Sequence, residues 1–181
     1  MTNAVAEIAT RLRGVVVLLA IGIATAAAAP GPDSAKGAFA DGMGRKIGTA
    51  KLTQTPAGVL IELDLKGLPP GEKAFHIHEH GACDPAGGFK SAGEHYDPRN
   101  NQHGLHAAKG PHAGDMPNQF VRQDGVLRAH VLNTVVTLAP GEASLFDADG
   151  SALVLHAKPD DYRSQPGGEA GDRIACAVVE R

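Results

Sequence analysis

The stretch Phe75-His76-Ile77-His78-Glu79-His80 places histidine at every second position of a short strand pattern. Successive side chains of a strand point to opposite faces, so His76 and His78 should lie side by side while Ile77 enters the core. Imidazole is the commonest metal ligand in proteins and suits zinc and copper. This stretch therefore predicts a strand that presents two metal ligands.

The interval of about forty residues after this strand carries further candidate ligands but no strand pattern, and it is rich in Gly, Pro, Asp, Asn and His. A long unstructured loop is uncommon in a compact domain, and bound metal would order this one. The candidate ligands are His76, His78, His95, His103, His112, His156 and Asp115. One tetrahedral ion takes four ligands, so the sequence indicates two ions, or one ion and spectators. We interpret His80, His106 and His130 as exposed or ordinary strand residues.

Short strand patterns flank the loop on both sides. In residues 59–66, Val59, Ile61, Leu63 and Leu65 fall on one face, which is typical of a half-buried strand. Asp124-Gly125 is a hairpin signal. Strands are expected at 47–53, 59–66, 74–79, on both sides of 124–125, and at 135–138, 152–156 and 174–179. About eight strands without a helix pattern predict an all-β sandwich or barrel.

The N-terminus does not belong to that domain. Arg11 and Arg13 precede an apolar run at 14–24, which is followed by four alanines at 26–29 and by Pro30. This is the order of a secretory signal peptide, and the run is short of the ~20 residues that a membrane span needs. We expect a signal peptide at 1–29, a linker at 30–37 and one domain at 38–181, exported and without stable membrane insertion after cleavage. An uncleaved anchor is the alternative.

The cysteine count and the charge restrict the protein further. Cys83 and Cys176 are the only two cysteines, and in an exported protein a pair predicts one disulfide. The formal charge of the full chain is -3, and it becomes slightly more negative when the leader with its two arginines and one glutamate is removed. A chain without a basic run and without Trp is not expected to bind nucleic acid.

Six motifs occur in a fixed order and resemble the signature of copper/zinc superoxide dismutases over residues 38 to 180. They are Phe75-His-Ile-His-Glu79, Ser91-Ala-Gly-Glu-His-Tyr-Asp-Pro98, His103-Gly, His112-Ala-Gly-Asp115, His156-Ala-Lys-Pro-Asp-Asp161 and Gly171-Asp-Arg-Ile-Ala-Cys176. The resemblance implies an eight-stranded Greek-key barrel or sandwich of immunoglobulin-like architecture with long metal-binding loops. It also implies the conversion of superoxide to oxygen and hydrogen peroxide, and it leaves the oligomeric state open, with a homodimer as one candidate. The leader is compatible with export to the periplasm, and secretion is the alternative.

The resemblance assigns roles to individual positions. It implies copper ligands at His76, His78, His95 and His156, and zinc ligands at His95, His103, His112 and Asp115, with His95 bridging the two ions. It implies that Asp160 hydrogen-bonds His76 and His103, and that Arg173 binds an anion beside the copper. Arg173 and His95 are thus the expected catalytic residues.

Two other functions are conceivable for such a chain. A non-catalytic periplasmic carrier of copper or zinc would not need Arg173, and a domain that had lost its metals would be expected to lack some ligands. Segment 160–172 has no lysine, so the residues that guide the substrate in this segment stay open, with Arg163 as one candidate. Lys90, Lys109 and Lys158 are candidates for a positive rim.

Overall fold

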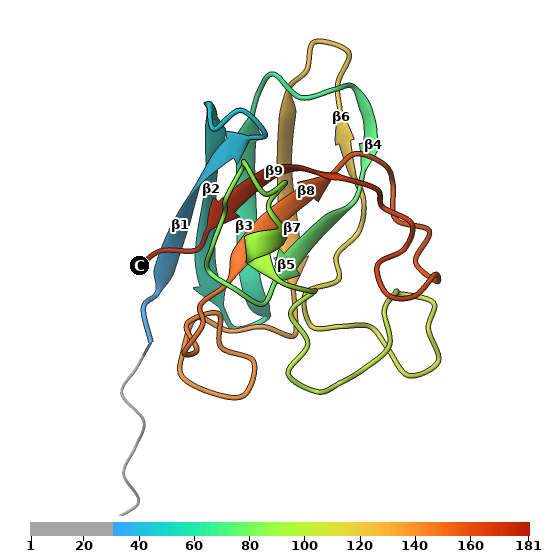
Figure 1. Ribbon diagram of the computed structural model, residues 1–181. Helices are drawn as coiled ribbons and strands as arrows, with labels where there is room; N and C mark the ends of the chain where they lie inside the picture. Colours follow the sequence, from blue (N-terminus) through green and yellow to red (C-terminus); the bar gives the residue numbers. More distant parts are fainter. Residues whose placement is uncertain (1–30) are drawn as a thin grey trace, which may run out of the picture.

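The computed structural model describes residues 31–181 as nine strands and one short 3-10 turn, η1 (Lys90–Ala92). The strands are β1 (Ser34–Asp41), β2 (Lys46–Thr55), β3 (Gly58–Leu65), β4 (Gly71–Lys73), β5 (Phe75–His78), β6 (Gln119–Val121), β7 (Leu127–Asn133), β8 (Ala152–His156) and β9 (Arg173–Val178). Seven of them form a curled antiparallel sheet in the order β5-β8-β9-β1-β2-β3-β7, and β4 pairs with β6 (Figure 1). The expected all-β fold is confirmed.

Alternation of apolar and polar residues builds this sheet around one core. In β3 the side chains of Val59, Ile61, Leu63 and Leu65 are buried, as their spacing predicts. β3 pairs with β2 on one side and β7 on the other, so its apolar face lies in the middle of a four-stranded region. The same core extends to β5, where Ile77 is fully buried. The strand with the two histidines is therefore fixed by its packing.

Two segments differ from the sequence expectations. The linker expected at 30–37 overlaps β1, whose inward positions include the small residues Ala35 and Gly37 and therefore give only a weak apolar signal. Residues 135–138 form no strand; only the isolated bridge of Thr137 with Ser144 is present there. The side chain of Asn133 accepts hydrogen bonds from the backbone of 135 and 136 and turns the chain after β7.

The turn at Asp124-Gly125 is present, with Gly125 N–H donating to the carbonyl of Arg122. The strands on its two sides do not form an isolated hairpin, because β6 pairs with β4 and β7 pairs with β3. The expected eight strands become nine because β1 and β4, neither of which was expected, are added and the expected strand at 135–138 is absent.

Two long connections meet at one side of the sheet. One runs from β5 to β6 and the other, residues 157–172, runs from β8 to β9 (Figure 1). His103 of the first and Gln165 of the second are joined by backbone-to-side-chain hydrogen bonds. No helix in the described part of the chain is long and apolar enough to cross a membrane. The expected signal peptide at 1–29 lies outside the described residues.

Candidate metal centre

β5 positions the site because both of its edges are paired. One edge pairs with β8, which ends at His156. On the other edge, Ile77 N–H donates to Gly114 O and Ile77 O accepts from Tyr96 N–H, both at 2.9 Å. A side chain at position 114 would collide with Ile77 O, so this close approach requires glycine. Loop residues distant in sequence are thereby brought next to the two histidines of β5.

Four histidine side chains converge in the first cluster, which consists of His76, His78, His95 and His156. The Nε2 atoms of His78 and His156 are 3.4 Å apart. Nδ1 of His78 lies 3.0 Å from Gly93 O, and Nδ1 of His156 lies 3.2 Å from Gly171 O. Because a carbonyl can only accept, each Nδ1 carries the proton and each Nε2 offers a lone pair to the cluster.

The second cluster consists of His95, His103, His112 and Asp115. Nδ1 of the three histidines lies 2.9, 3.1 and 3.5 Å from Asp115 Oδ1. Ligand atoms at the corners of a tetrahedral zinc site, 2.0–2.1 Å from the ion, are about 3.3 Å apart. The three separations from Asp115 Oδ1 therefore lie near the value for a tetrahedral ion, all four donor atoms lie within 4.8 Å of one another, and His95 belongs to both clusters.

Two buried ring nitrogens indicate whether the two clusters suit metal ions. Within residues 31–181, Nδ1 of His76 and Nδ1 of His112 are buried without a hydrogen-bond partner. Buried polar atoms are normally satisfied, because leaving one unpaired costs about 1–3 kcal/mol. One of these nitrogens lies in each cluster, and a cation at each position would satisfy them. The residues fit two metal ions.

The protonation states of His78, His95, His156 and Asp115 favour cation binding. In His103, burial acts to lower the pKa but hydrogen bonds with Asp115 and Asp160 raise it to about 9, so this ring has to release a proton. Burial lowers the pKa of His95 to about 4 and the pKa of His156 to about 3, and it also lowers the pKa of His78. These imidazoles are neutral at pH 7, so His78 and His156 can bind a metal through Nε2 without releasing a proton, whereas His95 has to release its one ring proton if it binds two ions. Burial acts to raise the pKa of Asp115, but its interactions with the rings of His103, His112 and His95 outweigh burial, so the carboxylate stays ionised.

Asp160 joins the two clusters from behind. Its Oδ2 accepts from Nε2 of His76 at 2.8 Å, and its Oδ1 accepts from Nε2 of His103 at 3.0 Å. These bonds assign the protons to Nε2, so that Nδ1 of both rings faces a cluster. Gly168 leaves the space for this arrangement, since a side chain there would collide with Asp160 Oδ1.

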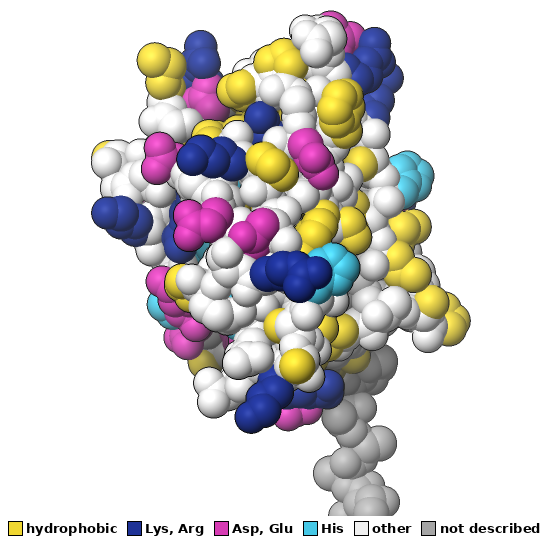
Figure 2. Space-filling view, turned by 90° about the vertical axis from the view of Figure 1, so that its right-hand side faces the viewer, with side chains coloured by type: hydrophobic (Ala, Val, Ile, Leu, Met, Phe, Trp, Pro, Cys, Tyr) yellow, Lys and Arg dark blue, Asp and Glu magenta, His cyan; other side chains and the backbone are white. Residues whose placement is uncertain are grey.

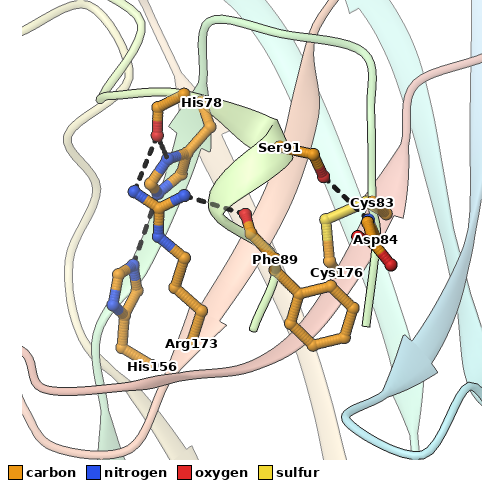
Figure 3. Close-up of a disulfide and its surroundings, with 9 residues drawn as sticks. His78, Cys83, Asp84, Phe89, Ser91, His156, Arg173 and Cys176 are labelled. Atoms are coloured by element: carbon orange, nitrogen blue, oxygen red, sulfur yellow. Dashed lines mark hydrogen bonds between the residues drawn. A yellow bond between two sulfur atoms is a disulfide. The ribbon is translucent and has the colours of Figure 1, made fainter. Parts of the chain in front are cut away.

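Arg173 is held beside the four-histidine cluster by the loop that carries the disulfide. Its Nη1 and Nη2 donate to Phe89 O at 2.9 Å and to Gly93 O at 2.7 Å, and its guanidinium lies beside His78 and His156 (Figure 3). The expected disulfide between Cys83 and Cys176 is present and ties this loop to β9. The guanidinium is half-buried.

Two surface hollows lead to the guanidinium of Arg173. One, of about 260 Å³, also reaches His95 and His156. The other, of about 380 Å³, is lined by Lys90 and by Glu94 and Asp172 as well. Neither hollow is lined by Arg163, Lys109 or Lys158, so of the expected cations only Lys90 joins Arg173 there. The rim carries charges of both signs.

Several residues that the sequence patterns left uncertain now have a position. His80 and His130 are largely exposed, and His106 packs against the ring of Tyr162; none of the three belongs to a donor cluster. Sequence reasoning did not single out Asn118 and Gln165, whose side chains bond the backbone of Asp160 and His103. A single amide has no spacing pattern that would reveal such a contact.

Comparisons with known proteins agree with this geometry. A family model described as copper/zinc superoxide dismutase matches residues 46–179. "Superoxide dismutase [Cu-Zn] 2" of Aquifex aeolicus is 55% identical over 138 residues, which cover 75% of this chain and 80% of that protein.

Solved structures give the same result. A double mutant of a SOD-like protein from Bacillus subtilis is 34% identical with a TM-score of 0.77, covering 81% of this chain and 97% of the other. The Cu/Zn superoxide dismutase from Brucella abortus is 27% identical with a TM-score of 0.65, covering 81% and 99%. The two donor clusters, the disulfide and these similarities lead to one conclusion: the chain belongs to the copper/zinc superoxide dismutase family.

Proposed function

We propose that this chain disproportionates superoxide with copper in the four-histidine cluster and zinc in the cluster that contains Asp115. Copper would be held by His76, His78, His95 and His156, and zinc by His95, His103, His112 and Asp115. Imidazoles suit a copper ion that changes oxidation state, whereas four fixed ligands suit structural zinc. The observation that carries the proposal is that two donor clusters share His95 and that each contains a buried, unpartnered ring nitrogen.

The chain's own residues supply binding and proton transfer. When bound, copper supplies one-electron chemistry and zinc a fixed positive charge. Two superoxide anions and two protons yield one oxygen and one hydrogen peroxide. Arg173 offers N–H donors to each anion and stabilises its charge. Nδ1 of His95 belongs to the zinc cluster, which leaves Nε2 as the atom that takes a proton and gives it to the second superoxide.

Metal analysis of the purified mature protein, combined with a superoxide-decay assay, tests this function. We expect one copper and one zinc per chain and decay that depends on copper. One copper and one zinc per chain without catalysed decay would contradict the enzyme and favour a metal carrier. A protein that binds neither ion would contradict both.

We further propose that the mature chain works outside the cytoplasm, periplasmic or secreted, protects against oxidative damage there and has no stable membrane insertion. The basic, apolar and alanine-rich order of residues 1–29 supports this, and so does a disulfide, since disulfides persist in oxidising compartments. N-terminal sequencing of exported protein should return Ala29 or Pro30, and a sequence starting at Met1 would contradict it. A homodimer is a further candidate state of the mature chain, and the molar mass from light scattering of the purified chain tests it.

A further inference from the structure

We propose that Asn118 and Gln165 are positioning residues that act together through Asp160, and so set the orientation of His76 in one donor cluster and His103 in the other. Each side-chain amide accepts a hydrogen bond from the backbone N–H of one residue on the opposite long connection and donates one to the C=O of the same residue. The inference concerns residues without a proposed metal contact, and it rests on the ligand division proposed above.

Asn118, just before β6, holds Asp160. Its Oδ1 accepts from Asp160 N–H at 2.8 Å, and its Nδ2 donates to Asp160 O at 2.9 Å. The backbone N–H of Asn118 donates to the hydroxyl of Tyr162 at 2.7 Å, and Tyr162 N–H donates to Asp160 Oδ1 at 2.6 Å. Asp160 is thus fixed at its amide, its carbonyl and its carboxylate, and it has little freedom to turn.

Gln165, on the 157–172 connection, holds His103 in the same way. Its Oε1 accepts from His103 N–H at 2.9 Å, and its Nε2 donates to His103 O at 2.8 Å. Nε2 also donates to Arg163 O at 3.0 Å, which ties the amide to its own loop. The ring of His103 then meets Asp160 Oδ1 at 3.0 Å.

Each of the two long connections supplies one amide that binds the backbone of the other connection. The zinc-ligand connection supplies Asn118 to hold Asp160, and the 157–172 connection supplies Gln165 to hold His103. The bonds of Asp160 to His76 and His103 assign the ring protons, and such partners of metal ligands commonly affect metal affinity or activity by about 10–100-fold. Removing either amide releases one end of the His76–Asp160–His103 hydrogen-bonded chain. Removing the second amide should therefore lower zinc affinity less than removing the first.

The test uses the disulfide-bonded mature chain. The variants are Asn118→Ala, Gln165→Ala and Gln165→Glu, with Gln119→Ala as the control, because the Gln119 amide bonds only to its neighbour Pro117 O. Zinc affinity is measured by competition with a chromophoric chelator, and the Cu(II) EPR spectrum is recorded for each loaded protein. We expect zinc affinity to fall about 10–100-fold in both alanine variants, less in Gln165→Glu, which keeps the acceptor for His103 N–H, and under 2-fold in the control.

A second series separates positioning from general stability. In an Asp160→Asn background, Asn118→Ala and Gln165→Ala should change zinc affinity less than about 2-fold, because the bridge on which they act is already altered. The EPR spectrum should change in the single variants and change little further in the doubles. A merely structural role would lower the melting temperature without changing the EPR spectrum.

Three results would overturn the proposal. The first is unchanged zinc affinity and an unchanged EPR spectrum in both alanine variants. The second is the same loss of affinity in the Asp160→Asn background as in the parent. The third is an equal loss in the Gln119→Ala control. All three leave metal binding by the parent intact, so they are distinguishable from a failure of the proposed ligand division.

Discussion

The side chain of Arg173 is held in one orientation by backbone oxygens and has a carboxylate nearby. Two of its nitrogens are occupied by the backbone oxygens of Phe89 and Gly93, which orients the guanidinium without neutralising it. Glu94 lies near enough to act on its charge, and Glu94 lines both hollows that reach it. The attraction that Arg173 is proposed to exert on an anion would therefore be local and would be opposed by a neighbouring carboxylate.

Replacing this guanidinium should slow the enzyme without removing its metals. We expect Arg173→Ile to reduce the superoxide rate by about one to two decades, equivalent to ~1.4–2.7 kcal/mol, and Arg173→Lys to retain more activity because the charge remains. Raising the salt concentration should slow the parent more than the Ile variant, since exposed charges are screened over about 8–10 Å. An Ile variant as fast as the parent, with the same salt response, would remove the anion-binding role.

The proposed division of ligands predicts two classes of variant. His112→Ala or Asp115→Ala should lose zinc first and reduce stability more than activity at saturating copper, because a closed zinc site contributes to folding directly. His78→Ala or His156→Ala should lose copper and activity together. Metal analysis and thermal unfolding of the four variants check this. Identical metal contents in the two classes would show that the division is wrong.

At the residue scale, the sequence predicted the donors, and its resemblance to a known family predicted the bonds of Asp160 to His76 and His103, but not the contacts that hold Asp160 and His103 in place. His76 and His78 could be predicted because a strand period of two fixes their faces. The contacts of Asn118 with Asp160 and of Gln165 with His103 join residues 42 and 62 positions apart, and a single amide carries no periodic signal. Such contacts become visible only when the two long connections are placed together.

The segment from the end of β5 to Gly93, which includes η1, connects the disulfide to Arg173. The disulfide joins residues 93 positions apart, and the loop beyond Cys83 supplies both oxygens that hold Arg173. The disulfide-bonded loop therefore also orients the side chain that we propose binds the anion.

Removing this bond should affect both stability and rate. We expect a Cys83→Ser, Cys176→Ser double variant to lose ~4–5 kcal/mol of unfolding free energy in the chain-entropy account. Its superoxide rate should also fall, by no more than in Arg173→Ile, because the charge remains but its anchor loosens. Denaturant unfolding and a rate assay at a temperature where the variant is folded check this. A full rate with a lowered stability would show that the loop holds Arg173 without the disulfide.

Element boundaries followed the strength of the apolar pattern. β3 and β8 were predicted closely because Val, Ile and Leu dominate their inward positions. β1 was missed because Ala35 and Gly37 bury little surface, although they pair in register with β2. Residues 135–138 looked like a strand, but part of their backbone bonds to side chains, with Asn133 serving Val135 and Val136 and Gln54 serving Leu138.

Over the whole molecule, charge is mixed rather than concentrated. The face formed by the two long connections carries basic and acidic side chains interspersed (Figure 2), and the full chain is net negative at -3. A negative molecule does not attract a small anion through its total charge, so guidance must come from the positive field near the site. This agrees with the predicted salt response of Arg173.

The stability of the metal-free protein should fall in mild acid. The lowered pKa values of His78, His95 and His156 mean that below about pH 6.5 the unfolded chain takes up protons that the folded chain resists. Their stabilising contribution is present above pH 6.5 and is lost as the pH falls toward 4. By pH 5 the loss amounts to up to about 2 kcal/mol each for His95 and His156.

The pKa of His103 has the opposite effect but does not cancel the loss. Burial acts to lower its pKa, yet hydrogen bonds with Asp115 and Asp160 raise it to about 9. Its stabilising contribution is complete below pH 6.5 and is lost only as the pH rises through 9. We expect the melting temperature of metal-free protein to drop by more than about 10 °C between pH 7 and pH 5. Calorimetry checks this, and a flat profile would contradict it.

The pairing of β5 with the metal-site loop has a consequence for self-association. β5 is the last strand of the seven-stranded order, so its outer edge has no neighbouring strand. Exposed edges are templates on which other molecules add strands and aggregate. Here Tyr96 and Gly114 of the loop occupy that edge, and they lie next to the proposed ligands His95 and Asp115. Ions that hold those ligands would thus also keep the edge closed to intermolecular strand addition.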